Sequence, residues 1–260
     1  MKFKISTIIS LAAFIALAGQ ALAHDFWAEA KSPKANQQLT AVIGYGHNFP
    51  EGEEIKPEAF AARFTQPKVI GDKGELTLEP GQNNRFYLTA DKLGPGNYVI
   101  STQTNPAFST RTKSGWESKP KNEVTDSVKC SNYFRYGKEA IVLGSAKYNE
   151  LAAKPLGHEL EIVPQADPSK IKVGQPFPVK VLYKGQALRG EEVSAYIAGL
   201  VKNNAALFFQ ARTDPEGLVN IIPLKAGDWL AKVSVEEPYS DSKVCDVINH
   251  TATYTFRVNN

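Results

Sequence analysis

The residues of this chain best suited to chemistry are its four histidines, and one of them directly follows a predicted processing site. Neutral imidazole is the commonest side-chain ligand for late first-row divalent metals. Residues 1–5 carry two lysines, residues 5–18 form an almost uninterrupted apolar run, and Ala21-Leu22-Ala23 is a small-x-small cleavage site. This arrangement is typical of a secretory signal peptide spanning residues 1–23. Cleavage after Ala23 would leave His24 as the first residue of the mature protein.

A terminal histidine can chelate a metal through two nitrogens, the free α-amino group and Nδ1 of the ring. An internal histidine cannot form this chelate because its backbone nitrogen is an amide. The amine and the imidazoles must be deprotonated to coordinate, so metal binding is expected to weaken as the pH falls. The alternative for His24 is a terminal residue that frays in solvent.

The other three histidines lie in different sequence settings. His47 follows the predicted strand Gln38–Tyr45 at the parity of its apolar residues, so it can stand at the mouth of that strand as a second metal ligand or serve as a turn residue. His250 precedes the predicted strand Thr251–Val258 at the parity of its apolar residues, which is typical of a core histidine. His158 lies at a predicted domain boundary, where it could orient an interface.

Carboxylates near His24 and His47 could complete a metal site or accept a hydrogen bond from an imidazole N–H. The sequence does not choose among them, and the run from Glu51 to Glu54 also fits an exposed acidic loop. Asp25, together with His158 and His250, is a weaker candidate ligand than His24 and His47. The carboxylates in question are Asp25, Glu29, Glu51, Glu53 and Glu54.

The elements that must position these residues are predicted to be strands. Apolar and polar residues alternate from end to end, with glycine and proline between the runs and no long helical periodicity. We therefore expect an all-β protein with two β-sandwich domains, residues 24–154 with the metal site and residues 155–260 with an immunoglobulin-like fold. Between Thr112 and Gly137 the alternation fails, which predicts a long connection with a short helix around Glu123–Cys130.

Composition limits the classes of partner. The chain has 30 basic and 27 acidic residues, and removal of a signal peptide with two lysines leaves 28 against 27. The basic residues are scattered, which argues against a nucleic-acid partner. The apolar run near the start is shorter than the roughly 20 residues that cross a bilayer, which favours cleavage over an uncleaved anchor. The mature protein is therefore expected in the periplasm and not spanning a membrane.

Two cysteines remain in the predicted mature chain, Cys130 and Cys245. Export to an oxidising compartment favours a disulfide between them. The alternative is a thiolate that binds a metal or acts as a nucleophile, but neither cysteine lies in a CxxC pair. Motifs of the common hydrolases, zinc peptidases, phosphate loops and dinucleotide sites are also missing from the sequence. We therefore predict a binding protein, not an enzyme.

Short motifs along almost the whole mature chain resemble a bacterial domain-of-unknown-function family, commonly described as the periplasmic component of cobalt or nickel uptake systems. The resemblance implies an exported all-β protein with a role in divalent metal uptake, and it carries His24 and His47 as site residues. His158 and the two cysteines do not belong to the family pattern. The matching motifs are His24-Asp25-Phe26-Trp27, Gly46-His47-x-Phe49, Glu51-Gly52-Glu53, Gly157-x-x-Leu160-Glu161-Ile162-x-Pro164, Gly185–Gly190, Thr213-Asp214-x-x-Gly217, Ala226–Trp229 and Thr253–Phe256.

The leading hypothesis is a periplasmic protein that binds nickel or cobalt through His24 and His47 and assists a membrane transporter or an outer-membrane receptor. Copper fits the same nitrogen ligands and would bind most tightly by the Irving–Williams order. The alternative is a non-enzymatic binding or adhesion module for a protein, a glycan or a metal chelate, with Trp27, Trp116 and Tyr133 as candidate pocket residues. A third hypothesis is a copper-dependent oxidative enzyme built on the terminal chelate.

Overall fold

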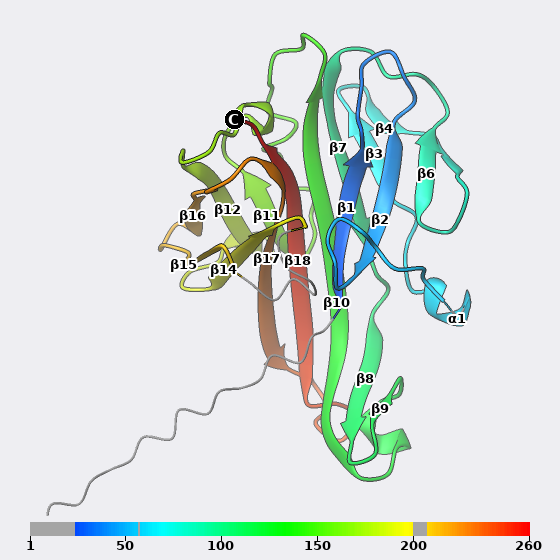
Figure 1. The fold of residues 1–260 in the computed structure, drawn as a ribbon. Coiled ribbons are helices and arrows are strands. Elements are labelled where there is room, and N and C mark those ends of the chain that lie inside the picture. The colour runs from blue at the N-terminus through cyan, green and yellow to red at the C-terminus, as the bar shows by residue number, and fades with distance from the viewer. Residues whose placement is uncertain (1–23, 57, 200–206) are drawn as a thin grey trace, which may run out of the picture.

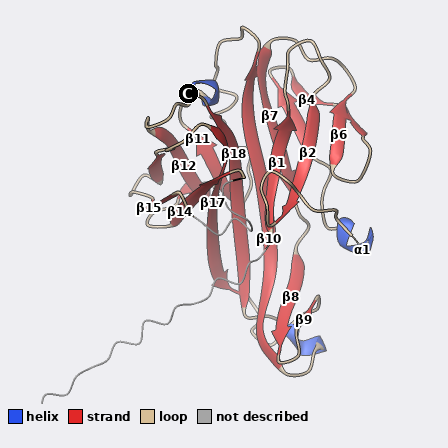
Figure 2. Cartoon of the chain, viewed as in Figure 1, coloured by secondary structure: helices blue, strands red, loops and turns tan. Residues whose placement is uncertain are grey.

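The computed structural model describes residues 24–56, 58–199 and 207–260, and nearly all of their regular structure is β (Figures 1 and 2). The helices are short: α1 covers Glu58–Ala61, and the 3-10 helices η1 and η2 cover Lys121–Glu123 and Pro168–Lys170. No helix within these described residues is long and apolar enough to cross a membrane. The all-β prediction is confirmed, and the predicted signal peptide, residues 1–23, lies outside the described residues.

One ten-stranded sheet runs through the middle of the molecule, in the order β15-β14-β17-β18-β10-β7-β3-β4, with β8 paired to β10 and β9 paired to β8. Strand β10 has 17 residues and extends along most of the molecule, where it pairs parallel with β18 and antiparallel with β7 and β8 (Figure 1). The bounds are β3 Lys68–Gly71, β4 Gly74–Leu76, β7 Gly96–Gln103, β8 Ala107–Thr112, β9 Trp116–Glu117, β10 Ser127–Leu143, β14 Glu192–Ile197, β15 Phe209–Arg212, β17 Gly227–Pro238 and β18 Val247–Val258.

Two smaller sheets complete the β-sandwich architecture. The first has the order β1-β2-β6-β5 and the second has the order β11-β12-β13, with β16 also paired to β12. The second sheet and strands β14, β15, β17 and β18 share one core and form the β-sandwich of the C-terminal half. The bounds are β1 Asp25–Lys31, β2 Thr40–Gly46, β5 Leu78–Pro80, β6 Phe86–Thr89, β11 Leu160–Pro164, β12 Phe177–Tyr183, β13 Gln186–Ala187 and β16 Leu218–Ile221.

The two smaller sheets pack against opposite faces of the large one, as alternate residues of β18 show. The Thr253 hydroxyl donates a hydrogen bond to the carbonyl oxygen of Phe26 in β1, at 2.7 Å. Tyr254, the next residue, is fully buried on the other side, where its ring lies 6.2 Å from that of Phe177 in β12. Because one strand serves both cores, residues 24–154 and 155–260 share a sheet, and their division into two domains stays a prediction.

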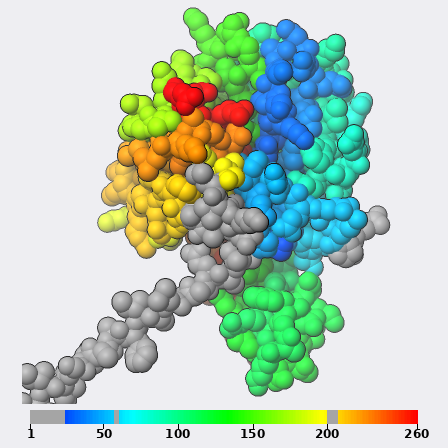
Figure 3. Space-filling model, viewed as in Figure 1, coloured from blue at the N-terminus to red at the C-terminus, as the bar shows by residue number. Residues whose placement is uncertain are grey.

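A lobe built from β8, β9 and the first part of β10 projects beyond the rest of the molecule (Figure 3). Cys130, which is paired with Thr110 of β8 within this lobe, is joined by a disulfide to Cys245, with 5.0 Å between the two Cα atoms, which confirms the predicted pairing. The predicted helix over Glu123–Cys130 is wrong. Residues from Ser127 onward are strand because they pair with β8 across the lobe, and such pairing overrides weak local preferences.

Candidate metal centre

His24 and His47 come together because of the register of the first two strands. Asp25 at the start of β1 is paired with Gly46 at the end of β2, so one further step along the antiparallel pair places His24 opposite His47. Directly opposed residues of such a pair project on the same face. The two imidazole rings have centroids 4.0 Å apart, and the His24 ring also stacks almost parallel on Tyr45, at 4.6 Å.

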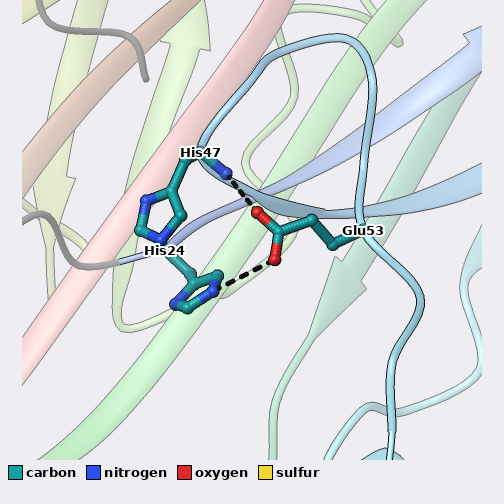
Figure 4. Close-up of side chains that lie close together, drawn as sticks. All are labelled: His24, His47 and Glu53. Atoms are coloured by element: carbon teal, nitrogen blue, oxygen red, sulfur yellow. Dashed lines mark hydrogen bonds and ion pairs between the residues drawn. The ribbon is translucent and has the colours of Figure 1, made fainter. Parts of the chain in front are cut away.

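Glu53 joins the two histidines from the loop that follows β2 (Figure 4). The Glu53 backbone N–H donates to the carbonyl oxygen of Tyr45 at 2.6 Å, which returns the loop to the strand end. One carboxylate oxygen accepts the backbone N–H of His47 at 3.1 Å, and the other lies 3.3 Å from Nε2 of His24. Gly46 has a φ of +143°, and a Cβ on it would stand 3.0 Å from the Glu53 side chain, so glycine suits this position.

Arg85, in the turn directly before β6 of the same sheet, holds this loop in place. Its guanidinium donates to the carbonyl oxygen of Gly52 at 2.5 Å and to that of Ile43 at 3.0 Å. A Cβ at Gly52 would lie 2.0 Å from a guanidinium nitrogen of Arg85, so a larger residue at this position would displace the guanidinium from the loop. The Glu51-Gly52-Glu53 motif therefore combines a residue that admits Arg85 with the carboxylate that faces the histidines.

The surroundings of His24 favour its neutral form. Burial lowers the pKa of the His24 imidazole, a charge on the adjacent His47 lowers it further, and Glu53 acts in the opposite direction. Neutral imidazole is the form that binds metals. The side chains of His24 and Glu53 are 37% and 43% exposed, so an ion can reach them from solvent.

Within the described residues, His24, His47 and Glu53 form the one group of three metal-ligating side chains whose donor atoms all lie within 4.8 Å of one another. Two ligands on opposite sides of one ion, each at about 2.1 Å, stand about 4.2 Å apart, so the spacing of this group suits one metal, with Glu53 as a ligand or as the acceptor that orients His24. Two imidazoles and a carboxylate suit several late first-row divalent metals.

Asp25 and His158, two of the weaker candidates, lie outside this group. The Asp25 carboxylate is buried, pairs with Nζ of Lys232 at 2.7 Å and accepts a hydrogen bond from the Tyr196 hydroxyl. It therefore fastens the start of β1 to β14 and β17. Nε2 of His158 lies 3.0 Å from the hydroxyl of Ser101 in β7, which ties the connection before β11 to the large sheet.

His250, the third weaker candidate, is a core residue, as its parity predicts. Its side chain is 1% exposed and Nδ1 is 3.3 Å from the Tyr136 hydroxyl. Nε2 has no hydrogen-bond partner among the described residues and faces Glu159 and Glu237 at 3.7 and 3.9 Å. His250 thus belongs to the core between the large sheet and the β11–β12 sheet, apart from the metal-ligating group.

A pocket of about 440 Å³ borders this group, because His24 and Tyr45 form part of its wall. Trp116 and Tyr133, which the sequence named as candidate pocket residues, also line it, whereas Trp27 is fully buried against Phe49. Most residues that line this pocket could not be predicted from the sequence, because they come from distant segments that share no motif. The remaining lining residues are Phe60, Arg63, Phe64, Thr104, Asn105, Ala107, Phe108, Ser109, Ser118 and Arg135.

The fold and the site together define an all-β sandwich protein with a histidine and carboxylate group at the end of its first strand pair. The chain belongs to the DUF4198 family, a domain of unknown function, which matches residues 21–237. This confirms the predicted membership of a bacterial domain-of-unknown-function family.

Solved structures similar to this chain include two fragments of Intimin. The D0-D1 domain of Intimin is 15% identical, with 89% of this chain and 97% of that chain covered and a TM-score of 0.21. The D00-D0 domain of Intimin is 10% identical, with 91% and 100% covered and a TM-score of 0.22. Comparison with curated proteins gives no match.

Proposed function

We propose that this protein is a periplasmic binding protein for a divalent transition metal, nickel or cobalt, and that it assists metal uptake without being an enzyme. The observation that carries the proposal is the convergence of His24, His47 and Glu53, three residues from separate segments, at the end of the first strand pair. Signal-peptide cleavage after Ala23 would add the α-amino group of His24 to this group.

Glu53 has a defined role in the proposed centre. Its carboxylate stands at Nε2 of His24, so an N–H there donates to Glu53 and leaves Nδ1 free. Nδ1 is the ring nitrogen that forms a chelate with the terminal amine. Metal-binding histidines usually donate their second ring N–H to such an acceptor, which fixes the orientation of the ring. The amine and Nδ1 of His24 with one nitrogen of His47 then provide three nitrogen ligands.

These ligands do not by themselves select nickel or cobalt. These ligands would bind copper most tightly. Selection of nickel or cobalt in the cell would therefore depend on which metal is supplied and on the transporter or receptor that receives it. Nickel and cobalt are preferred here because of the family resemblance in the sequence.

Calorimetric titration of the cleaved protein with Ni²⁺, Co²⁺ and Cu²⁺ tests the proposal. We expect one ion to bind per chain. A version with one extra residue before His24 should lose most of this metal affinity, because the extra residue converts the amine of His24 to an amide. His47→Gln should cost affinity to a similar degree, and Glu53→Gln about 10- to 100-fold, the usual effect of losing an orienting partner.

Glu54→Gln is the matched control, since the Glu54 carboxylate is exposed and pairs with Lys56 at 2.8 Å. It should bind metal as the unaltered protein does. Equal affinities in the cleaved and extended proteins would contradict the terminal chelate, and an absence of binding in both would contradict the proposed function.

A second candidate is a non-enzymatic binding module for an organic ligand, and the pocket beside His24 favours it. In that case the extra residue before His24 and the His47→Gln substitution would change metal binding without changing the affinity for the organic ligand. Titration of both ligands on the same variants separates the two functions.

A further inference from the structure

The pocket beside the candidate metal centre has the size and walls of a small-molecule site. Its volume of about 440 Å³ lies within the range of roughly 300–1,000 Å³ typical of ligand pockets. It lies among the end of β2, helix α1, the strand β9 and the middle of β10, so its walls come from segments far apart in the sequence. His24 belongs both to this wall and to the metal-ligating group.

Aromatic rings form a large part of the pocket wall, since six of its fourteen lining residues are phenylalanine, tyrosine or tryptophan. Phe64 is the centre of a cluster, with its ring 5.3 Å from those of Tyr45 and Phe60. Trp116 on the opposite lobe is 59% exposed, which is unusual for so large an apolar side chain. Rings arranged in this way offer faces and edges on which a flat molecule can stack. The six aromatic lining residues are Tyr45, Phe60, Phe64, Phe108, Trp116 and Tyr133.

The pocket is also positively charged. Arg63 and Arg135 line it and none of its lining residues is an aspartate or glutamate. The Arg135 guanidinium lies 5.6 Å from the ring centre of Tyr133, and that of Arg63 lies 5.3 Å from the ring centre of Phe60. Among the ion pairs of the described residues neither arginine has a carboxylate partner. A guanidinium held in this way is suited to a ligand carboxylate, which it can bind through two parallel hydrogen bonds.

From these features we propose that the pocket binds a small aromatic carboxylate that also coordinates the metal at His24, so that the protein takes the ion as an organic complex. The inference rests on the proposed function and specifies its ligand. The ring stacks on the aromatic wall, the carboxylate faces Arg63 and Arg135, and a ring donor atom next to the carboxylate reaches a metal held by His24 and His47. A simple inorganic anion would use the arginines but not the aromatic wall.

Pyridine-2-carboxylate is a direct probe, because it is flat, anionic and has a ring nitrogen beside its carboxylate. Benzoate lacks the ring nitrogen, and pyridine lacks the carboxylate. We expect Ni²⁺ with pyridine-2-carboxylate to bind the cleaved protein about tenfold or more tightly than either component alone. Benzoate should bind without affecting the affinity for Ni²⁺, and pyridine should bind least.

Arg135→Gln and Arg63→Gln separate the pocket from the metal centre. Each substitution should lower the affinity for pyridine-2-carboxylate and for benzoate about tenfold, the usual loss for a hydrogen bond to a charged group. The affinity for Ni²⁺ alone should change little. Arg111→Gln is the control, because Arg111 is exposed on β8 and does not line the pocket. Thermal unfolding of each variant checks that the fold is retained.

The possible failures can be told apart. If Ni²⁺ alone does not bind, the proposed function fails and the shared-metal inference fails with it. If Ni²⁺ binds but pyridine-2-carboxylate neither binds nor raises its affinity, the inference is overturned while the proposed function stands. Carboxylate binding that is equal in the Arg63, Arg135 and Arg111 variants would also overturn the inference.

Discussion

At the scale of single residues, one buried carboxylate organises the connection between the two halves of the chain. Glu161 in β11 accepts the backbone N–H groups of Leu156 and Gly157, at 2.8 and 3.2 Å. It also pairs with Nζ of Lys138 in β10 at 2.8 Å, and both side chains are almost completely buried. The Gly-x-x-Leu-Glu-Ile-x-Pro motif therefore contains the residue that fixes the connection to the large sheet.

Removal of this buried charge should be strongly destabilising. We expect Glu161→Gln to lower the free energy of unfolding by about 3–5 kcal/mol, because it leaves the Lys138 ammonium buried without its partner. Glu75→Gln is the control, since Glu75 pairs with Lys68 at an exposed site, where such pairs contribute about 0–1 kcal/mol. Urea unfolding measures both, and similar losses in the two variants would contradict the assigned role.

Residue-scale electrostatics also predict how stability depends on pH. Burial lowers the pKa of His250 below its usual 6.5, although Glu159 and Glu237 act in the opposite direction. The folded protein thus favours neutral His250, and the unfolded chain takes up the proton more readily as the pH falls below about 6.5. The stabilisation that comes from keeping His250 neutral is therefore fully present above pH 6.5. It is lost as the pH falls from there towards the lowered pKa of His250 in the folded protein.

Urea unfolding at pH 7.5 and pH 5.5 tests this prediction. The free energy of unfolding should be smaller at pH 5.5, and His250→Gln should reduce the difference between the two pH values. A difference of the same size in the variant would show that other groups cause the pH dependence.

At the scale of elements, the position of β1 depends on a glycine in the large sheet. A Cβ at Gly137 in β10 would lie 2.5 Å from the backbone nitrogen of Ala28 in β1, so the two strands cross in backbone contact. His24 directly precedes β1, and β1 is tied to β14 and β17 through Asp25. The placement of the candidate metal centre is therefore set by contacts of β1 with the large sheet.

We expect Gly137→Ala to destabilise the fold by about 1–3 kcal/mol or more, because backbone cannot move aside as a flexible side chain can. It should also weaken metal binding, since β1 positions His24, the residue directly before it. Gly94→Ala is the control, because a Cβ there meets no atom within 4 Å. Chemical unfolding and metal titration of the two variants provide the comparison, and equal stability would show that β1 can shift without cost.

At the scale of the whole molecule, the disulfide joins segments that are 115 residues apart. It connects β10 to the loop before β18, where Lys121 and the backbone N–H of Cys130 also contact Asp246. A crosslink over so long a loop restricts the unfolded chain and contributes about 4–5 kcal/mol in the chain-entropy description.

The double substitution Cys130→Ser and Cys245→Ser should lower the thermal unfolding midpoint by about 10 °C. Metal binding at 25 °C should be unaffected, because the disulfide does not contribute to the His24, His47 and Glu53 group. Calorimetry with matched reduced and oxidised samples of the unaltered protein is the companion measurement. A midpoint that does not change in either experiment would contradict a stabilising role for the disulfide.

The all-β class, most strand positions and the Cys130–Cys245 bond could be predicted from the sequence, because alternation is a local signal and two cysteines allow one pairing. His24 and His47 could be named as well, since one follows a cleavage motif and the other ends an alternating strand. The helix predicted near Glu123 was wrong because strand pairing with β8 is not visible locally.

Only the tertiary structure decided which carboxylate joins the two histidines. Glu51, Glu53 and Glu54 are equivalent in sequence, and the return of the loop to Tyr45 together with the Arg85 clamp selects Glu53. It likewise decided that Asp25, His158 and His250 lie outside the group, and that one sheet unites both halves. These outcomes depend on strand register and packing between distant segments. The pattern of a single segment indicates only whether that segment forms a strand or a helix and where it begins and ends.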